Sequence, residues 1–268
     1  MREDSSVRSS AIRQHLFRAG FSSVQQIAAA VGASVATIRP DLLVLEAEGA
    51  IARNHGGACI SESAGDDVAS ELREQHNLAA KRAIGDAPFD LIMPHSTIFL
   101  AAGTTVLQVA RRIWLNRLPL SVFTNCLTIA QVLVTVRDLK LTLLGGHLRP
   151  QNVSLVGGFA EAMLDQLWFD QLFLGTGAID EECCLYSLNE KEARLNGKML
   201  SRATSKNLLV DSSKFGRRLT YRVAKLSADT AIVTDDGITL NWRTRLKEAG
   251  CKTRVVTGAI PASNKIRT

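Results

Sequence analysis

The sequence predicts an α+β winged helix-turn-helix domain followed by a larger α/β domain with a mostly parallel sheet. Three observations support this prediction. The first sixty residues hold three short helical patterns separated by glycines, a glycine-rich turn follows the third pattern, and short apolar runs alternate with helical segments beyond residue 89. A chain of 268 residues, 46% of them hydrophobic, can bury a core in each of two domains.

The first two helices are expected from apolar spacing and from the residues at their ends. Apolar residues recur at helical spacing over residues 7–19, so we expect a helix there that Gly20 ends. Ser22-Ser23 offers hydroxyl caps for a second helix, which Gly32 ends.

The third helix completes a helix-turn-helix. Ser34 is the expected N-cap, Ile38, Leu42 and Leu45 form an apolar face, and Gly49 stands at the end. Three short helices with a tight glycine turn before the third are typical of this motif. The sequence therefore predicts a domain over residues 1–60 whose third helix is the reading element.

A wing is expected after the third helix. Ile51 opens a strand, and a basic, glycine-rich turn over residues 53–57 follows it. Such a turn can place cations and backbone N–H groups on phosphates, while the N-terminal residues of the third helix reach base edges in the major groove. We expect double-stranded DNA to be contacted by Ser34, Val35, Ala36, Thr37, Arg39, Arg53, Asn54 and His55. The alternative is a winged helix used only for protein contacts.

Charge supports this interpretation only weakly. The net charge of +6 and the sequence pI near 9.2 permit a polyanionic partner. However, residues 1–60 contain six arginines, no lysine and five acidic residues, which leaves about +1 in the predicted DNA-binding domain. The prediction of DNA binding therefore depends on the helix-turn-helix motif and not on charge.

Pro40 conflicts with part of this pattern. If Ser34 is the N-cap, Pro40 lies inside the helix, and its missing N–H leaves the Ala36 carbonyl without its partner at a cost of about 3 kcal/mol. If Thr37 is the cap, Pro40 falls in the first turn, where proline is tolerated. The sequence leaves both alternatives open.

The second domain is expected from alternation of strands and helices. Residues 61–88 are predicted to form a polar linker (61–67) and a helix (68–87) that couples the domains, and residues 89–268 the α/β domain. Strands are expected at 97–100, 120–124, 139–144, 172–174, 208–210, 231–233 and 253–256, with helices at 105–114, 127–134, 160–167, 190–203 and 242–249. Alternation of this kind predicts a mostly parallel sheet covered on both faces.

Polar and glycine residues fall where these strands end. Gly103-Thr104-Thr105 follows the first strand, Asn125 the second, Gly145-Gly146 the third and Gly175 the fourth, and a turn ending in Lys214 follows a later one. Ligands of parallel sheets bind at the carboxyl edge, and a Gly-Thr-Thr turn that opens a helix suits an anion. Each turn alone is more often a tight connection, but five at one edge predict a pocket.

Cysteine usage and hydropathy point to the cytoplasm. The five cysteines show no C-x-x-C pair and no metal-ligand spacing with histidine, so we expect reduced thiols, no metal site and no cofactor. Cys183-Cys184 is either a redox pair or two ordinary buried residues. The N-terminus is too polar for a signal peptide. Residues 118–136 carry no charge but hold several polar groups, which favours a strand and a helix over a membrane span.

Several segments resemble the DeoR/GlpR family of bacterial transcriptional regulators. They are SVATIRPDLLVLEAEGAIARNHGGA (34–58), LAAGTT (100–105), VFTN (122–125), LLGGHLRPQNVSLVG (143–157), FLGTGAI (173–179), NEKEARLNGKML (189–200) and VDSSKFG (210–216). The resemblance implies a winged helix joined to a sugar-phosphate-sensing domain with a phosphosugar isomerase-like fold. It further implies a homo-oligomeric repressor of carbohydrate genes whose DNA affinity depends on a phosphorylated sugar.

The resemblance also implies where the effector binds. Its phosphate would lie at Gly103, Thr104 and Thr105, with Asn125, Gly145, Gly146 and Lys214 around it and Glu192 and Asp211 near the sugar hydroxyls. Three positions depart from the family pattern: Pro40 and Asn196 replace an arginine and a lysine, and Ala101 replaces an aspartate. Two alternatives stay open, a sugar-phosphate isomerase or deaminase and a paralogue that no longer senses a ligand.

Overall fold

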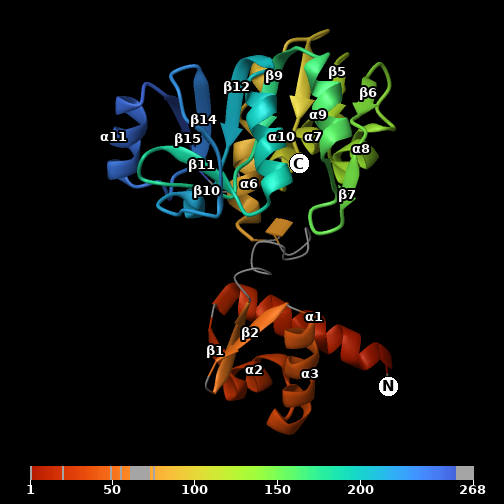
Figure 1. Ribbon diagram of the computed structural model, residues 1–268, viewed down its shortest axis with the longest axis vertical. Coiled ribbons are helices and arrows are strands. Elements are labelled where there is room, and N and C mark those ends of the chain that lie inside the picture. The colour runs from red at the N-terminus through yellow and green to blue at the C-terminus, as the bar shows by residue number, and fades with distance from the viewer. Residues whose placement is uncertain are drawn as a thin grey trace, which may run out of the picture. The chain divides into compact units, whose positions relative to one another are not determined.

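Two units make up the chain, Met1–His76 and Asn77–Thr268, and each is described by itself (Figure 1). The computed structural model describes residues 2–19, 21–48, 50–54, 56–60, 73–74 and 76–257. The division falls inside the segment 61–88 that the sequence assigns to a linker and a coupling helix. The predicted linker, 61–67, lies outside the described residues, so the boundaries at 60 and 88 stay predictions.

The first unit is a winged helix. Its elements are α1 (Arg2–Ala19), β1 (Ser22–Ser23), α2 (Val24–Val31), α3 (Val35–Ala47), β2 (Ile51–Asn54) and β3 (Gly57–Ile60), with an antiparallel sheet in the order β1-β3-β2. The first helix thus begins at Arg2 instead of residue 7. One apolar core joins all three helices to the sheet and contains Ile12, Leu16, Ile27, Ala28, Ile38, Leu42, Leu45, Ile51 and Ala58.

Local sequence explains the ends of these elements. Ser23 and Gln26 form a capping box at the start of α2, because the side chain of each accepts the other's backbone N–H. Gly57 lets the wing approach β1, since a Cβ atom there would lie only 2.4 Å from the Ser22 carbonyl oxygen. The wing therefore packs on β1 only because residue 57 has no side chain.

The second unit is built on a seven-stranded sheet in the order β15-β14-β12-β9-β4-β5-β6, in which every neighbouring pair is parallel. The strands are β4 (Thr97–Leu100), β5 (Ser121–Thr124), β6 (Lys140–Leu143), β9 (Phe169–Leu174), β12 (Ala203–Leu209), β14 (Thr230–Asp235) and β15 (Lys252–Val256). All seven predicted strands are in this sheet, and the predicted fold class is confirmed.

Helices cover both faces of this sheet. On one face α9 (Gly158–Asp165), α10 (Glu190–Leu200) and α11 (Leu240–Glu248) share a core with Phe99; α9 and α10 cross the front of the sheet in Figure 1. On the other, α6 (Leu78–Asp86), α7 (Val106–Asn116) and α8 (Leu127–Leu133) share a core with Ile98 and Leu100. Successive strand residues point to opposite faces, which gives the short apolar runs of β4 two cores to fill.

The sequence did not predict the shorter strands of the second unit. A hairpin pairs β7 (His147–Arg149) with β8 (Ser154–Val156), and a second antiparallel sheet contains β10 (Ala178–Ile179), β11 (Cys184–Ser187) and β13 (Tyr221–Lys225). Two 3-10 turns, η1 (Phe89–Leu91) and η2 (Ser212–Lys214), complete the unit. Strands of two to five residues with mixed polarity show too few periods to be distinguished from loops.

Two predicted helices need correction. The helix expected at 190–203 ends at Leu200, because Ala203 already pairs with Phe169 in the sheet. The coupling helix expected at 68–87 is interrupted, since Asn77 has a left-handed backbone (φ 54°) and α6 begins only at Leu78. Residues 68–72 and 75 lie outside the described part of the chain.

Among the described residues no single helix has the length and apolarity to cross a membrane; only α2 and α3 together pass that test, and they are bent by 105°.

Candidate functional sites

Of the two N-caps that the sequence left open for α3, Ser34 and Thr37, the structure has Ser34. The Ser34 backbone is extended, and its Oγ accepts the Thr37 N–H at 3.1 Å, so Ser34 is the N-cap and the Thr37 alternative is wrong. The Thr37 hydroxyl also lies 2.8 Å from the Ser34 hydroxyl. The first helical turn is therefore held by its own side chains.

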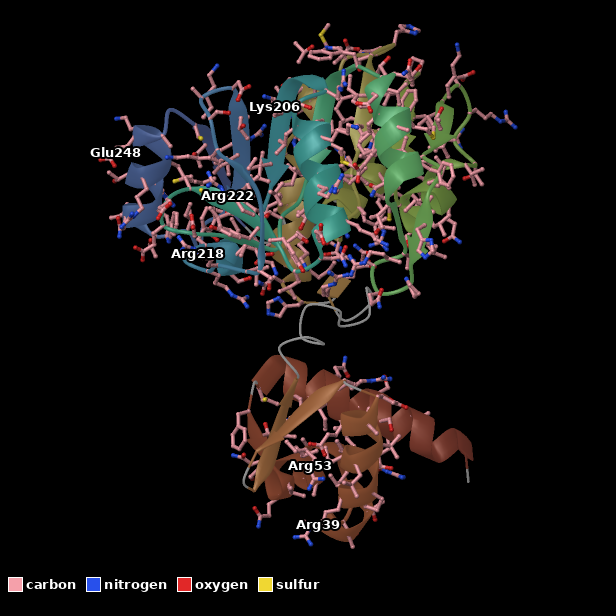
Figure 2. All side chains as sticks on the ribbon, in the orientation of Figure 1. Arg39, Arg53, Lys206, Arg218, Arg222 and Glu248 are labelled. Carbon is pink, nitrogen blue, oxygen red and sulfur yellow. The ribbon has the colours of Figure 1, made fainter. Side chains whose placement is uncertain are left out.

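Most of the predicted reading residues face outward. Ser34, Ala36, Thr37 and Arg39 are exposed, and Figure 2 shows the Arg39 side chain extending away from the unit. Val35 is half-buried and packs against the core of the winged helix. Of the α3 candidates, Val35 is thus the one placed to support the helix instead of facing DNA.

Pro40 lies inside α3, which continues past it to Ala47. Pro40 has no N–H for the Ala36 carbonyl, but both residues are exposed, so water can reach that carbonyl and reduce the cost of about 3 kcal/mol. Buried Ile38 and Leu42 anchor the helix on either side of the proline. Tertiary packing therefore overrides the local penalty.

An ion pair that sequence reasoning missed fixes α3 against α1. Arg8 Nε donates to Asp41 Oδ2 at 2.5 Å and Arg8 Nη2 to Oδ1 at 3.3 Å, and Asp41 is only 6% exposed. A signal was available, because Asp41 shares the buried face of α3 with Ile38 and Leu45, and a buried charge needs a partner.

The wing carries one described cation. Arg53 Nη1 lies 3.3 Å from Glu46 Oε2, and Figure 2 places Arg53 beside α3. Both side chains are more than a third exposed, so the pair contributes little to stability and Arg53 can exchange it for a phosphate. The strand of Asn54 is described but its side chain is not, and His55 lies outside the described residues.

The predicted phosphate turn lies between β4 and α7. Gly103 and Thr104 are half-buried, Thr105 is buried, and α7 starts at Val106. The Leu107 and Gln108 N–H groups at the start of α7 already donate to the Gly103 and Thr105 carbonyls, so the dipole of this eleven-residue helix is what favours an anion at the turn.

Asn125 shapes that turn. Its side chain is 1% exposed; Oδ1 accepts the Ala102 N–H at 2.9 Å, and Nδ2 donates to the Leu155 carbonyl at 3.1 Å. The carboxamide therefore ties the end of β4 to β8. In this geometry Asn125 holds the backbone around the expected phosphate instead of pointing at it.

The glycines after β6 allow a close approach. Gly145 is exposed, and its N–H donates to Met163 Sδ at 3.1 Å. Gly146 has φ +145°, and a Cβ atom there would lie 2.8 Å from the Val156 carbonyl oxygen. The hairpin β7–β8 can fold back onto the sheet edge only with glycine at residue 146.

Glu192 in the first turn of α10 is already surrounded by donors. Its Oε2 accepts the Ser187 hydroxyl at 2.7 Å and lies 3.3 Å from Arg149 Nη1, and its Oε1 accepts Asn152 Nδ2 at 2.5 Å. The carboxylate thereby holds the hairpin against α10. Arg149, Asn152 and Ser187 were not predicted, although the first two lie in the segment 143–157 that matches the family.

Asp211 follows β12 and is 1% exposed. Its Oδ1 accepts the Ser213 hydroxyl at 2.5 Å, the Ser213 N–H at 3.2 Å and Asn77 Nδ2 at 3.0 Å. Burial raises the pKa of Asp211, but the Ser213 hydrogen bond and the charge of Lys214 outweigh burial and hold it below its ordinary value. Asp211 is therefore ionised near neutral pH.

The predicted effector residues thus share one edge of the sheet. They lie after β4, β5, β6 and β12 and at the start of α10, in three groups held by Asn125, Glu192 and Asp211. In the structure Asn125 binds the backbone of the β4 turn, and the positive charge of Lys214 lowers the pKa of Asp211. The side chains of Asn125, Glu192 and Asp211 mostly bind the protein itself.

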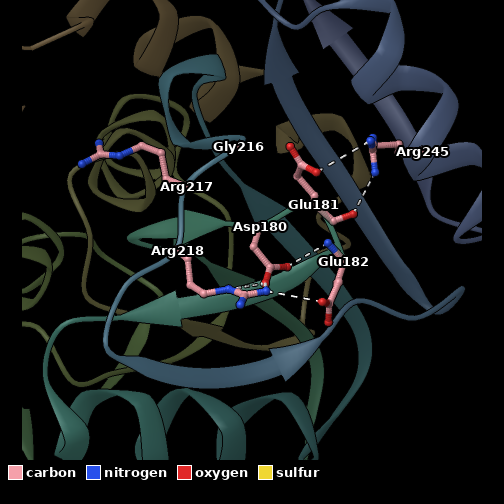
Figure 3. A pocket seen from close by; sticks show the side chains of 7 residues that line it. All are labelled: Asp180, Glu181, Glu182, Gly216, Arg217, Arg218 and Arg245. Carbon is pink, nitrogen blue, oxygen red and sulfur yellow. Dashed lines mark hydrogen bonds and ion pairs between the residues drawn. The ribbon is translucent and has the colours of Figure 1, made fainter.

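A hollow of about 470 Å³ lies elsewhere on the second unit. It is lined by Asp180, Glu181, Glu182, Gly216, Arg217, Arg218 and Arg245 (Figure 3), and none of the predicted effector residues is among them. Its three acidic residues pair with two of its three arginines: Arg218 Nη2 lies 2.7 Å from Asp180 Oδ2 and also pairs with Glu182, and Arg245 pairs with Glu181. The hollow therefore offers no excess charge to an anion.

A possible metal cluster next to this hollow does not fit a cation. Ligand atoms of Asp180, Glu182 and Cys184 lie within 4.8 Å of one another. Asp180, however, already accepts hydrogen bonds from Arg218, Tyr186 and two backbone N–H groups. Burial raises the pKa of Asp180 and these donors lower it, with the net effect downward. Arg218 already pairs with Asp180 and Glu182, two of the three candidate ligands.

Comparison with known families identifies the two units. A model described as the DeoR C terminal sensor domain matches residues 76–236, and one described as the DeoR-like helix-turn-helix domain matches residues 8–64. The chain belongs to the DeoR family. It is accordingly a DNA-binding transcriptional regulator, and the resemblance seen in the sequence is confirmed.

Curated relatives agree with the DeoR assignment. The chain is 35% identical over 253 residues to a protein named as an aga operon transcriptional repressor of Escherichia coli O157:H7, with 94% of both chains covered. It is 37% identical to the HTH-type transcriptional regulator GlpR of Haloferax volcanii, over 85% of this chain and 89% of that protein. It is 30% identical to the glycerol-3-phosphate regulon repressor of Escherichia coli K12, over 81% of this chain and 85% of that protein.

Among solved structures the chain is similar to ribose 5 phosphate isomerase A from Neisseria gonorrhoeae, with 10% identity, a TM-score of 0.38, and 55% and 57% of the two chains covered. Likeness at this level says nothing about chemistry. The DeoR-family relatives named above are transcriptional regulators rather than enzymes.

Proposed function

We propose that this DeoR-family protein represses carbohydrate genes and that its affinity for operator DNA changes when a phosphorylated sugar binds to the second unit. The names of its relatives, which refer to the aga operon and the glycerol-3-phosphate regulon, support carbohydrate genes as the targets. The ligand must bind the DNA-competent and DNA-incompetent states with different affinity, because equal affinity shifts no equilibrium.

One observation carries the effector proposal: the turn Gly103-Thr104-Thr105 stands between a central strand and the N-terminus of α7. This position offers an anion the positive end of an eleven-residue helix and the backbone of the turn itself. Gly145 and Gly146 follow β6 at the same edge, where Gly146 lets β8 approach closely, and Lys214 supplies a cation on that edge. We assign the phosphate to this turn and the sugar to the space between it, Glu192 and Asp211.

Two departures bear on which sugar fits. Ala101 is fully buried in the core where the family has an aspartate, and half-buried Asn196 on α10 replaces a lysine. The edge therefore has one acid and one cation fewer than its relatives, while the backbone groups at the β4 turn are unaffected. We infer that a phosphate still binds and that contacts to the sugar differ.

The DNA contacts are proposed for the outer surface of α3 and for the wing. Thr37 and Arg39 are exposed at the N-terminal half of α3, the part of a recognition helix that reaches base edges, and Arg53 can reach a phosphate. Ser34, Ala36, Asn54 and His55 complete the proposed surface, with Val35 as its support. Because one winged helix covers one half-site, we also propose a homo-oligomer.

The test uses the full-length protein and DNA upstream of its own gene. Fluorescence anisotropy at low salt is expected to show specific binding that weakens about tenfold when Arg39→Ala removes a guanidinium, whereas Arg243→Ala on α11 leaves binding unchanged. Thermal shift with glucose 6-phosphate, fructose 1-phosphate, ribose 5-phosphate and glycerol 3-phosphate is expected to raise the melting point with at least one of them. The absence of any specific DNA binding would contradict the proposal, and turnover of a sugar phosphate would favour the enzyme alternative.

A further inference from the structure

One hydrogen bond connects the predicted effector edge to the residue at which the second unit begins. Asn77 Nδ2 donates to Asp211 Oδ1 at 3.0 Å across 134 positions of sequence. Asn77 is the first residue of that unit, and the chain toward the winged helix continues from His76. A side chain at the exit of the sensor unit is thus bonded directly to a buried carboxylate of the effector edge.

The geometry around Asn77 makes this bond specific. Asn77 has a left-handed backbone (φ 54°, ψ 33°) directly before α6, and its carbonyl accepts the Lys81 N–H at 3.0 Å. Lys81 and Ile84 of α6 are buried in the second unit. The start of α6 and the orientation of the Asn77 carboxamide are therefore set together.

The acceptor is shared with the turn that carries Lys214. The same Oδ1 of Asp211 accepts the Ser213 hydroxyl and the Ser213 N–H. Burial raises the pKa of Asp211, but Ser213, Lys214, Asn77 and Lys81 together lower it by more than burial raises it. The carboxylate is therefore charged, and its hydrogen bond to Asn77 is charge-assisted. Ser213 and Lys214 thus act on the same charge as Asn77 and Lys81.

We propose that the Asn77–Asp211 hydrogen bond is the connection through which effector binding changes the segment leading to the winged helix. The inference rests on the proposed function, because it needs an anion at the edge that carries Lys214. An anion that draws Lys214 or the Ser213 hydroxyl toward itself removes donors and positive charge from Asp211. The bond to Asn77 then changes in strength, and the two states of the protein differ at the exit of the sensor unit.

The variant that isolates this bond is Asn77→Gly. Glycine adopts the left-handed backbone of residue 77 without strain, so the substitution removes the carboxamide and leaves the turn intact. His95→Gly is the matched control: His95 is also exposed and left-handed (φ 66°), but it precedes β4, at the edge of the sheet opposite the effector residues.

The first measurement compares ligand binding with ligand response. With the sugar phosphate that raises the melting point of the wild type, we expect the wild type and His95→Gly to change operator Kd by about tenfold. Asn77→Gly is expected to keep the rise in melting point but to change operator Kd by less than about twofold. A full change of operator Kd in Asn77→Gly would overturn the inference and leave the proposed function standing.

A second measurement does not depend on finding the sugar. The Lys81 N–H bonds the Asn77 carbonyl, so its hydrogen exchange reports on the start of α6. Asn77→Gly and Asp211→Asn are both expected to speed this exchange several-fold in the full-length protein, and His95→Gly is expected to leave it unchanged. Unchanged exchange in both variants would overturn the inference, whereas a wild type that ignores all four sugar phosphates would count against the proposed function alone.

Discussion

The two candidate sites treat their polar residues in opposite ways. On α3 the proposed reading residues Thr37 and Arg39 are exposed and are positioned mainly by the helix that carries them. On the sheet edge Asn125, Glu192 and Asp211 are at least largely buried, and each binds two or more protein donors or acceptors. The proposed DNA surface therefore presents side chains, whereas the proposed effector edge uses its side chains to hold its own backbone.

The largest expected effect is unfolding of the second unit in acid. The pKa values of Asp165, Asp180, Asp211 and Asp229 are all lowered on folding: by Lys198 for Asp165, by Lys206 for Asp229, and for the other two by donors that outweigh burial. A carboxyl with a lowered folded pKa contributes stability above its unfolded pKa of about 3.9, and this stability is lost as the pH falls through the folded pKa.

We therefore expect the melting temperature of the second unit to fall steeply below about pH 4. Calorimetry of the full-length protein between pH 7 and pH 2.5 measures this, and Asp211→Asn is expected to flatten the pH dependence because residue 211 no longer titrates. Equal stability of the second unit at pH 7 and pH 3 would show that its saturated carboxylates do not stabilise it.

The next largest effect is expected from Asp41→Ala, which removes the buried carboxylate of α3 that pairs with Arg8. Breaking a largely buried ion pair by removing one partner is expected to destabilise the winged helix by about 3 kcal/mol and to abolish operator binding at 37 °C. The double variant Arg8→Met/Asp41→Leu removes both charges and is expected to recover most of the stability. Equal unfolding free energies for wild type and Asp41→Ala, from urea titration, would contradict this role.

A smaller effect is expected at Pro40. Pro40→Arg restores an N–H to α3 and adds an exposed cation, so operator binding should tighten and its log–log salt slope should steepen by about 0.9. Pro40→Ala separates the two causes, because it restores the N–H without the charge and should raise the melting point with the salt slope unchanged. An unchanged salt slope in Pro40→Arg would mean that residue 40 does not face phosphate.

The smallest effect is expected from Glu46→Ala, which frees Arg53 of its exposed partner. Stability should change by less than about 0.5 kcal/mol, since exposed ion pairs contribute little. Operator affinity should rise about twofold at low salt and not at high salt, because Arg53 becomes available to a phosphate and is then screened. Affinity that falls instead would place Glu46 itself at the DNA.

Much of the fold followed from local patterns. Short apolar runs predicted every strand of the parallel sheet, and the serine cap before α3 and the glycine after α2 marked the recognition helix. The patterns failed where a single residue departs from its neighbours. The break before α6 depends on the left-handed backbone of Asn77, and the end of α10 on the pairing of Ala203 with Phe169.

The sequence placed the polar turns at one edge but did not reveal the partners of their side chains, and their binding of an effector stays a prediction. The turns after β4, β5, β6 and β12 do share one edge, as parallel topology requires. Their side chains take partners that spacing does not reveal: Asn125 bonds Ala102 and Leu155, and Glu192 bonds Asn152 and Ser187. The single clue in the winged helix was Asp41, a charge on an otherwise apolar face.

The order along the chain of the seven parallel strands, the third helix of the winged helix and the edge of the sheet that carries polar turns were therefore determined by the sequence alone. Periodicity and end signals act over a few residues, and parallel connection leaves one arrangement for the turns. Only the tertiary structure decided which donors saturate each buried carboxylate, from Arg8 on Asp41 to Asn77 on Asp211. Those pairs join residues 33 and 134 positions apart, and such distances are closed only by the packing of the whole unit.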